Sequence, residues 1–142
     1  MAAHDYMSAY QSYSMAIRAQ STAGVHYSNR SAASCKLGDY LAALEDAELC
    51  IKLKPDWPKS YGRKGRALQG LGFLQLAVEA YMQMQECECS SDKPSAETTQ
   101  TIAKLQEELA TATESTRDQE INDLQQMMQV SVDFNSSFPH FR

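Results

Sequence analysis

Residues 25–58 read VHYSNRSAASCKLGDYLAALEDAELCIKLKPDWP, and this stretch decides the fold. On both sides of the pair Gly38-Asp39, small and apolar side chains recur every three or four positions, which predicts two helices joined by a tight turn. We expect these helices over 24–37 and 40–53, with the Asp39 side chain capping the second one. The stretch therefore predicts a helical hairpin.

The same pattern recurs 34 residues earlier and 34 residues later, so the hairpin is one unit of a repeat. The columns in register are Ala9 with Ala43 and Ala77, Tyr13 with Ala47 and Tyr81, Tyr6 with Tyr40 and Leu74, Gly38 with Gly72, Tyr27 with Tyr61, and Ala16 with Cys50 and Met84. Small residues recur where two helices approach closely, and aromatic residues recur where a gap must be filled. A helix–turn–helix unit that repeats every 34 residues is the signature of the tetratricopeptide repeat (TPR).

We therefore predict an all-α TPR solenoid with one half repeat, two full repeats and a C-terminal capping helix. Helix 5–18 is expected to be the second helix of a repeat whose first helix this chain lacks, because only four residues precede it. The second full repeat is expected near 58–87. The predicted division of the chain is a solenoid over 1–94, a capping and extension helix over 95–130, and a flexible tail over 131–142.

Composition narrows the classes of function. The net charge of −5 argues against a general nucleic-acid binder, although six of the thirteen basic residues lie within 52–66. No apolar run is long enough to cross a bilayer, and the N-terminus has neither the basic start nor the apolar core of a signal peptide. We therefore expect a cytoplasmic protein with reduced cysteines that binds neither nucleic acid nor membrane.

The sequence offers no catalytic site. It contains no nucleophile–base constellation, no Gly-rich phosphate loop after a strand and no carboxylate pair with an evident role, so we expect a protein that is not an enzyme. Cys87 and Cys89 are spaced like metal ligands, but neither a second Cys pair nor a nearby His completes a set. We expect no metal and no cofactor.

Helical spacing places several polar side chains on one face. The first helices of stacked repeats line the inner groove of a solenoid, and Asn29, Lys59 and Arg63 project into that groove if this face is the inner one. Two cations beside an amide suit a carboxylate ligand, which Arg can bind through two parallel hydrogen bonds. The alternative is that Lys59 and Arg63 form an ordinary solvated i,i+4 face.

Four segments carry a resemblance to a known family. They are residues 27–33 (YSNRSAA), 36–40 (KLGDY), 53–57 (LKPDW) and 59–64 (KSYGRK). They resemble the carboxylate-clamp TPR domains of heat-shock organising and small glutamine-rich co-chaperones, and the similarity covers roughly residues 5–87. In that family the groove holds the C-terminal Glu-Glu-Val-Asp peptide of cytosolic heat-shock chaperones. The resemblance implies that Asn29, Lys59 and Arg63 bind peptide carboxylates; Arg66, which shares the face of Lys59 and Arg63 by helical spacing, is a further candidate.

This chain departs from the family's pattern at one place. The family's remaining clamp Lys and Asn lie on the first helix of the first repeat, so the resemblance implies a co-chaperone or adaptor whose affinity for chaperone tails is weakened. The alternative function is a structural assembly or scaffold subunit, which would bind other proteins through the exposed faces of helices 5–18 and 117–130. An assembly subunit should be oligomeric without any peptide.

Overall fold

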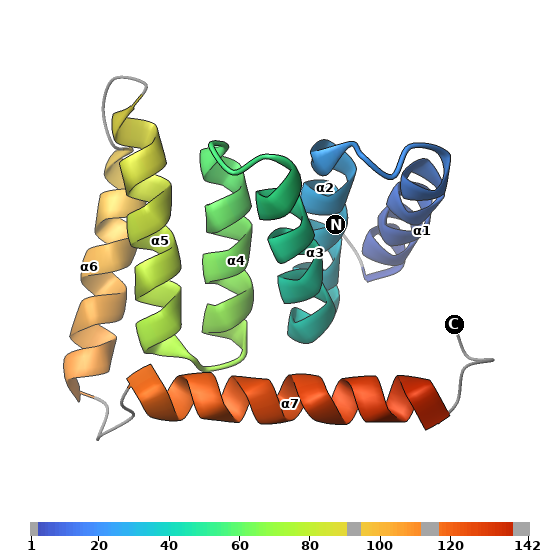
Figure 1. The fold of residues 1–142 in the computed structure, drawn as a ribbon. Coiled ribbons are helices and arrows are strands. Elements are labelled where there is room, and N and C mark those ends of the chain that lie inside the picture. Colours follow the sequence, from blue (N-terminus) through green and yellow to red (C-terminus); the bar gives the residue numbers. More distant parts are fainter. Residues whose placement is uncertain (1–2, 91–94, 112–116, 138–142) are drawn as a thin grey trace.

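The computed structural model describes residues 3–90, 95–111 and 117–137, which form helices and no strand. The helices are α1 (Ala3–Ala19), α2 (Gly24–Leu37), α3 (Tyr40–Leu53), α4 (Pro58–Gly70), α5 (Leu74–Cys89), α6 (Ala96–Thr111) and α7 (Arg117–Ser137). The first six stand side by side as antiparallel neighbours, and α7 runs across one end of the stack (Figure 1). None of the described helices is both long and apolar enough to span a bilayer.

The two hairpins follow the prediction. Helices α2 and α3 span 24–37 and 40–53, as expected from the sequence. Gly38 and Gly72 close the turns with φ of 82° and 86°, a conformation that glycine adopts without steric cost. Asp39 caps α3, since its Oδ1 accepts a hydrogen bond from the Ala42 amide at 3.2 Å.

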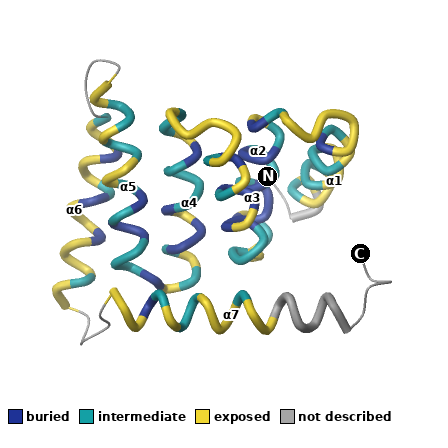
Figure 2. Tube along the Cα trace, in the orientation of Figure 1, coloured by how far each residue is buried: buried dark blue, intermediate teal, exposed yellow. Residues whose placement is uncertain are grey.

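The small residues of the repeat lie where helices cross closely. Ala43 and Ala77 are completely buried, whereas their register partner Ala9 on α1 is only half-buried. A Cβ added to Gly65 would lie 2.9 Å from the ring of Tyr81, so the aromatic side chain of α5 packs against bare backbone of α4. The buried apolar residues form two clusters, a large one that runs from α2 to α6 and a small one at Ile17, Tyr27 and Cys50; Figure 2 colours the chain by burial. The repeat columns are thus packing columns.

An ion pair joins the two helices of the first hairpin. Arg30 of α2 donates from Nε and Nη2 to the two carboxylate oxygens of Asp46 on α3, at 2.8 and 2.7 Å. The hydrogen bond to Asp46 raises the pKa of Arg30. The Arg30 guanidinium also lies 5.7 Å from the ring centroids of Tyr10 and Tyr27. Arg30 therefore connects α1, α2 and α3 and serves the fold.

The predicted capping helix is confirmed, because α6 buries Ile102 and Leu105 against the core of α4 and α5. The extension beyond it differs from expectation. Residues 117–137 form a separate helix that turns across the end of the stack and continues to Ser137, past the expected end at 130. The predicted tail over 131–142 is therefore helical as far as Ser137, and its last residues lie outside the described part.

One carboxylate fixes α7 to the solenoid. Glu120 is only 2% exposed, and its two oxygens accept hydrogen bonds from the Gln75 and Leu76 amides at 3.2 and 3.0 Å. These amides lie in the first turn of α5, whose own preceding residue, Phe73, supplies no side-chain cap. Glu120 therefore caps α5 from a different helix. Its negative charge also interacts favourably with the positive, N-terminal end of the α5 dipole.

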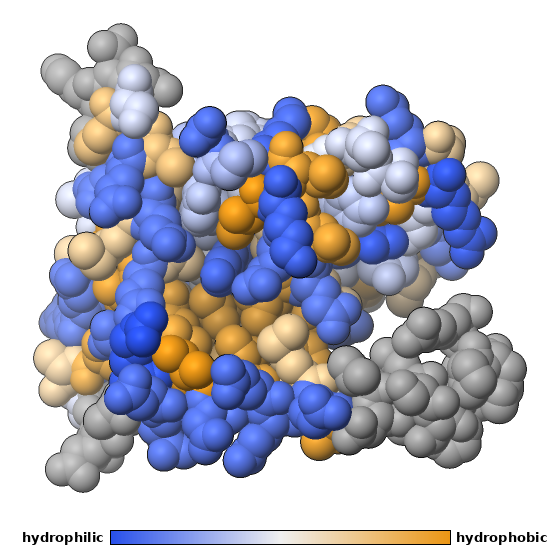
Figure 3. Space-filling view, in the orientation of Figure 1, coloured by the Kyte–Doolittle hydropathy of each residue, from blue (hydrophilic) through white to orange (hydrophobic). Residues whose placement is uncertain are grey.

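A cavity of about 330 Å³ lies between α7 and helices α3, α4 and α5. Its floor is apolar, with Leu68, Leu76 and Leu124, and Lys64 and Glu48 pair at 3.3 Å on its rim. Figure 3 shows this apolar surface gathered directly above the polar outer face of α7. Helix α7 thus covers part of the end of the solenoid and leaves part of it open.

Candidate functional site

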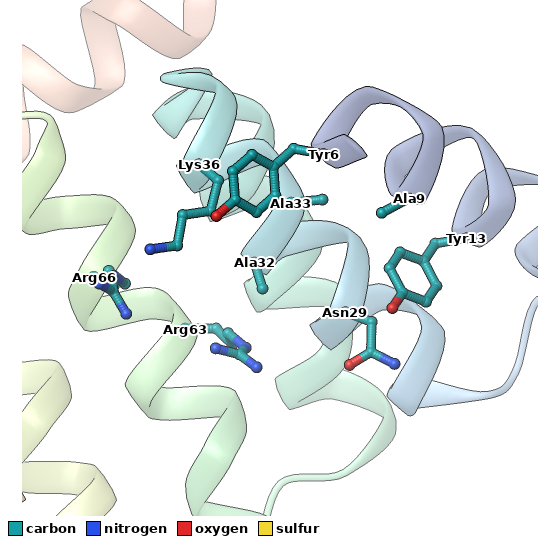
Figure 4. A pocket seen from close by; sticks show the side chains of 9 residues that line it. All are labelled: Tyr6, Ala9, Tyr13, Asn29, Ala32, Ala33, Lys36, Arg63 and Arg66. Atoms are coloured by element: carbon teal, nitrogen blue, oxygen red, sulfur yellow. The ribbon is translucent and has the colours of Figure 1, made fainter. Parts of the chain in front are cut away.

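The main candidate site is a cavity of about 230 Å³ between α1, α2 and α4 (Figure 4). The residues that line it are Tyr6, Ala9, Tyr13, Asn29, Ala32, Ala33, Lys36, Arg63 and Arg66. One wall is apolar, made by α1 and the alanines of α2. The opposite wall carries amide and cationic groups from α2 and α4. A ligand here meets an apolar surface on one side and hydrogen-bond donors on the other.

Helical spacing sets the polar wall. Asn29 and Lys36 are seven residues apart on α2, and Arg63 and Arg66 are three apart on α4, so each pair shares one face. Arg63 donates from Nε to Ser28 Oγ at 3.2 Å, and Ser28 is completely buried. This bond orients the guanidinium and leaves its two terminal nitrogens for a ligand.

A second cavity, of about 430 Å³, continues the first between α4, α5 and α6. Arg63 and Arg66 line both cavities, whereas Lys59 lines only the second. The structure thus brings Asn29, Arg63 and Arg66 together and places Lys59 one helical turn away, beside Arg63. The two cavities form one groove along α4, and we call it the α4 groove.

The cations of the α4 groove lack internal counter-ions. Within the described residues, no carboxylate forms an ion pair with Lys59, Arg63 or Arg66. Lys59 Nζ lies 5.9 Å from the Trp57 ring centroid, a contact that does not neutralise its charge. Burial lowers the pKa of Arg63, and the neighbouring positive charge of Arg66 lowers it further. An anion bound here would relieve this repulsion.

Sequence reasoning missed the tyrosines of the apolar wall. Tyr6 and Tyr13 lie in repeat columns, and we interpreted those columns as packing positions. Of their equivalents, Ala47 on α3 has no exposed surface, whereas Tyr40 on α3 and Tyr81 on α5 are partly exposed. Tyr81 lines the second cavity as Tyr6 and Tyr13 line the first. One repeat column can thus serve packing in one helix and the groove in another, and the sequence pattern does not distinguish the two.

In the part of the chain that the structure describes, neither the cysteines nor a group of metal-ligand side chains forms a second site. All four cysteines are free thiols, with Cys35 and Cys50 buried and Cys89 exposed at the end of α5. No group of three or more His, Cys, Asp or Glu side chains is placed to hold a metal ion among the described residues. Burial raises the pKa of the Cys35 thiol, which disfavours its reactive thiolate.

The relatives of this chain are TPR proteins, although no family profile matches the sequence. Over 77 residues, 54% of its length, it is 47% identical to the heat shock protein sti1 homolog of Schizosaccharomyces pombe, of which it covers 13%. Over 92 residues, 65% of its length, it is 38% identical to small glutamine-rich tetratricopeptide repeat-containing protein 2 of Mycosarcoma maydis, of which it covers 26%. The chain thus spans well under two thirds of either relative.

Solved TPR domains have the same fold. The Sgt2 TPR domain from Aspergillus fumigatus is 27% identical, with a TM-score of 0.70 over 80% of this chain and 76% of that one. The first TPR of Spaghetti (RPAP3), solved bound to the HSP90 peptide SRMEEVD, is 27% identical, with a TM-score of 0.68 over 75% of this chain and 83% of that one. These comparisons confirm the predicted all-α TPR solenoid and the resemblance to heat-shock organising and small glutamine-rich TPR proteins.

Proposed function

We propose that this protein is a non-catalytic co-chaperone or adaptor module that binds the acidic C-terminal peptide of a heat-shock chaperone in the α4 groove. In this proposal Asn29 donates its amide to the terminal carboxylate, and Arg63 binds a carboxylate through two parallel hydrogen bonds. Lys59 and Arg66 hold the acidic side chains next to it. Such partners are cytosolic, so we also propose a cytoplasmic location.

One observation carries this proposal: where the two cavities of the α4 groove meet, Arg63 and Arg66 have no ion-pair partner among the described residues. The charge of Arg63 is half-buried and therefore costly without a partner, so the site favours an anionic ligand. The comparison with RPAP3 supports the choice of ligand, because that TPR domain holds the HSP90 peptide SRMEEVD. The apolar wall with Tyr13 suits the valine that precedes the terminal aspartate of such a peptide.

We expect weak binding. Asn29, Lys59 and Arg63 match three of the family's five clamp residues, and the described groove shows no match for the other two. Charge-assisted hydrogen bonds are worth about 1.5–3 kcal/mol each, and about 1.4 kcal/mol is a factor of ten, so their loss weakens binding by about a hundredfold or more. The expected Kd lies between about tens of micromolar and about one millimolar, and it rises with added salt because exposed charges are screened.

Titration of a fluorescent peptide ending in Glu-Glu-Val-Asp tests the proposal. Arg63→Ala should weaken binding at least about tenfold, because it removes a charge-assisted contact. Arg117→Ala is the matched control, since Arg117 lies on α7 outside the groove and pairs with Glu79 at 2.6 Å. If the unaltered protein and Arg63→Ala bind the peptide equally well, a carboxylate clamp is excluded. Undiminished binding of a peptide whose C-terminal carboxyl is amidated would exclude it too.

The assembly alternative also has an observation in its favour. Met15 on α1 and Val130 on α7 are each 69% exposed, so both helices offer an apolar side chain to a second protein. The solution mass of the protein without peptide separates the two functions. A stable oligomer that dissociates on Met15→Lys or Val130→Lys substitution favours assembly, and a monomer that binds the peptide favours the adaptor.

A further inference from the structure

The second cavity of the α4 groove has a wall that the clamp does not use. This wall belongs to α6, which buries Ile102 and Leu105 on one side and turns Thr101 and Lys104 toward the cavity. The α4 wall opposite it carries Lys59, Arg63 and Arg66. The capping helix of the solenoid is therefore also one side of the groove.

Lys104 is the free donor on this wall. The hydroxyl of Thr98 donates to Glu88 Oε1 at 3.3 Å, and that of Thr101 donates to the Glu97 carbonyl at 2.8 Å. No described carboxylate lies within ion-pair distance of Lys104. Lys104 is exposed and lines the cavity, so its ammonium group is available on a long side chain.

The charge around the second cavity is strongly unbalanced. Four cations line it, and Glu97 is the one carboxylate among its lining residues. The first cavity, by contrast, is walled mainly by alanine and tyrosine side chains. A ligand that fits both cavities is apolar next to its terminal carboxylate and acidic farther along. The larger volume of the second cavity, about 430 against about 230 Å³, gives room for several residues.

We propose that α6 forms a second subsite through Lys104, which holds acidic side chains upstream of the ligand's last four residues, next to those that Lys59 and Arg66 hold in the clamp. This inference rests on the proposed function, because it assumes that the terminal carboxylate lies beside Asn29 in the first cavity. It adds a specificity to that function: the module selects chaperone tails with an acidic stretch before the terminal motif. Glu97 opposes this selection by repelling the same side chains.

Three labelled peptides test the subsite: Glu-Glu-Val-Asp alone, an octapeptide with four glutamates before it, and an octapeptide with four glutamines before it. Lys104→Gln should weaken the glutamate octapeptide about two- to fivefold, the usual range for one exposed ion pair, and leave the other two unchanged. Glu97→Gln should strengthen the same octapeptide by a similar factor. Both residues are exposed, so neither change should disturb folding. Lys52→Gln on α3, outside the groove, is the matched control.

The outcomes separate the subsite from the clamp. If Lys104→Gln affects all three peptides equally, or none while the tetrapeptide still binds, the subsite is wrong and the clamp stands. If the tetrapeptide fails to bind but the glutamate octapeptide binds in a Lys104-dependent way, the subsite stands and the clamp falls. If none of the three peptides binds, both the subsite and the clamp are wrong.

Discussion

The two edges of the solenoid differ in what covers them. At the N-terminal edge, α2 is the main neighbour of α1 among the described helices, and Ser8 and Ser12 on another side of α1 are exposed. At the C-terminal edge, α6 covers one side of α5, and α7 crosses the N-terminal end of α5. The register makes the difference measurable: Asp46 and Ala80, the equivalents of Ser12, are 4% and 1% exposed. The same column is core in two repeats and surface in the third.

This difference shows which groups must be covered at the two ends of a solenoid. The stacking of repeats leaves each edge with an apolar side and with unpaired backbone groups at helix ends. The C-terminal edge satisfies both needs, with Leu105 filling the core and Glu120 accepting from two amides of α5. At the N-terminal edge the described residues show no such cover over the Ser8 and Ser12 side of α1, whereas Tyr6, Ala9 and Tyr13 on another side of α1 form the apolar wall of the α4 groove.

The largest expected effect comes from removing the covered edge. A chain that ends after Pro94 loses the buried side chains of Ile102 and Leu105 and the cap from Glu120. Each apolar side chain contributes about 1.5–3 kcal/mol, so the loss should reach about 5 kcal/mol or more, much of the stability of a typical domain. Urea unfolding followed by circular dichroism measures it. An unchanged midpoint would show that α6 and α7 are appendages.

Glu120→Ala should have the next largest effect. It leaves the Gln75 and Leu76 amides without their acceptor, and a lost bond to a charged group costs about 1–3 kcal/mol. We expect a decrease of about 2–4 kcal/mol in the free energy of unfolding. Glu107→Ala, an exposed glutamate on α6, is the control and should change it by less than about 0.5 kcal/mol. Equal effects of the two substitutions would refute the capping role.

Hydrogen exchange should reveal the open edge directly. Helix α1 has one packed side and few buried residues, of which Ile17 is the most buried, so it should open at lower free energy than α3 and α4. We expect amides near Tyr13 to exchange at least about tenfold faster than those near Ala47. Equal or greater protection of the α1 amides would show that the exposed side of α1 does not lower its local stability.

The sequence predicted the edges less well than the middle. Repeat columns place α2 and α3 correctly, because each column reports a contact between helices close in the chain. The bond from Glu120 joins residues 45 apart, and an acidic residue in the first turn of a helix looks like an ordinary surface charge. Only the folded structure shows that α7 crosses the end of the stack and that Glu120 is buried there.

The same contrast holds within the candidate site. Helical spacing predicted that Asn29 and Arg63 share the groove, and both line the first cavity. Lys59 lies one turn earlier on α4, which is enough to place it in the second cavity beside α6. That helix follows a loop with no repeat pattern, so the sequence did not indicate that its Lys104 faces the same space.

The smallest predicted effects come from paired substitutions in one repeat column. Ser12→Ala should stabilise the protein by about 0.3–0.5 kcal/mol, because Ser12 is exposed, its hydroxyl bonds only to the Ser8 carbonyl at 3.0 Å, and alanine is the better helix former. Ala80→Ser, in the same column, should destabilise it by about 1–2 kcal/mol, because a hydroxyl would enter a site that is 1% exposed. Urea midpoints of both variants measure the pair. Opposite signs are expected if one column is surface at α1 and core at α5. A destabilising Ser12→Ala would mean instead that a partner, such as a second copy of the chain, covers that side of α1 in solution.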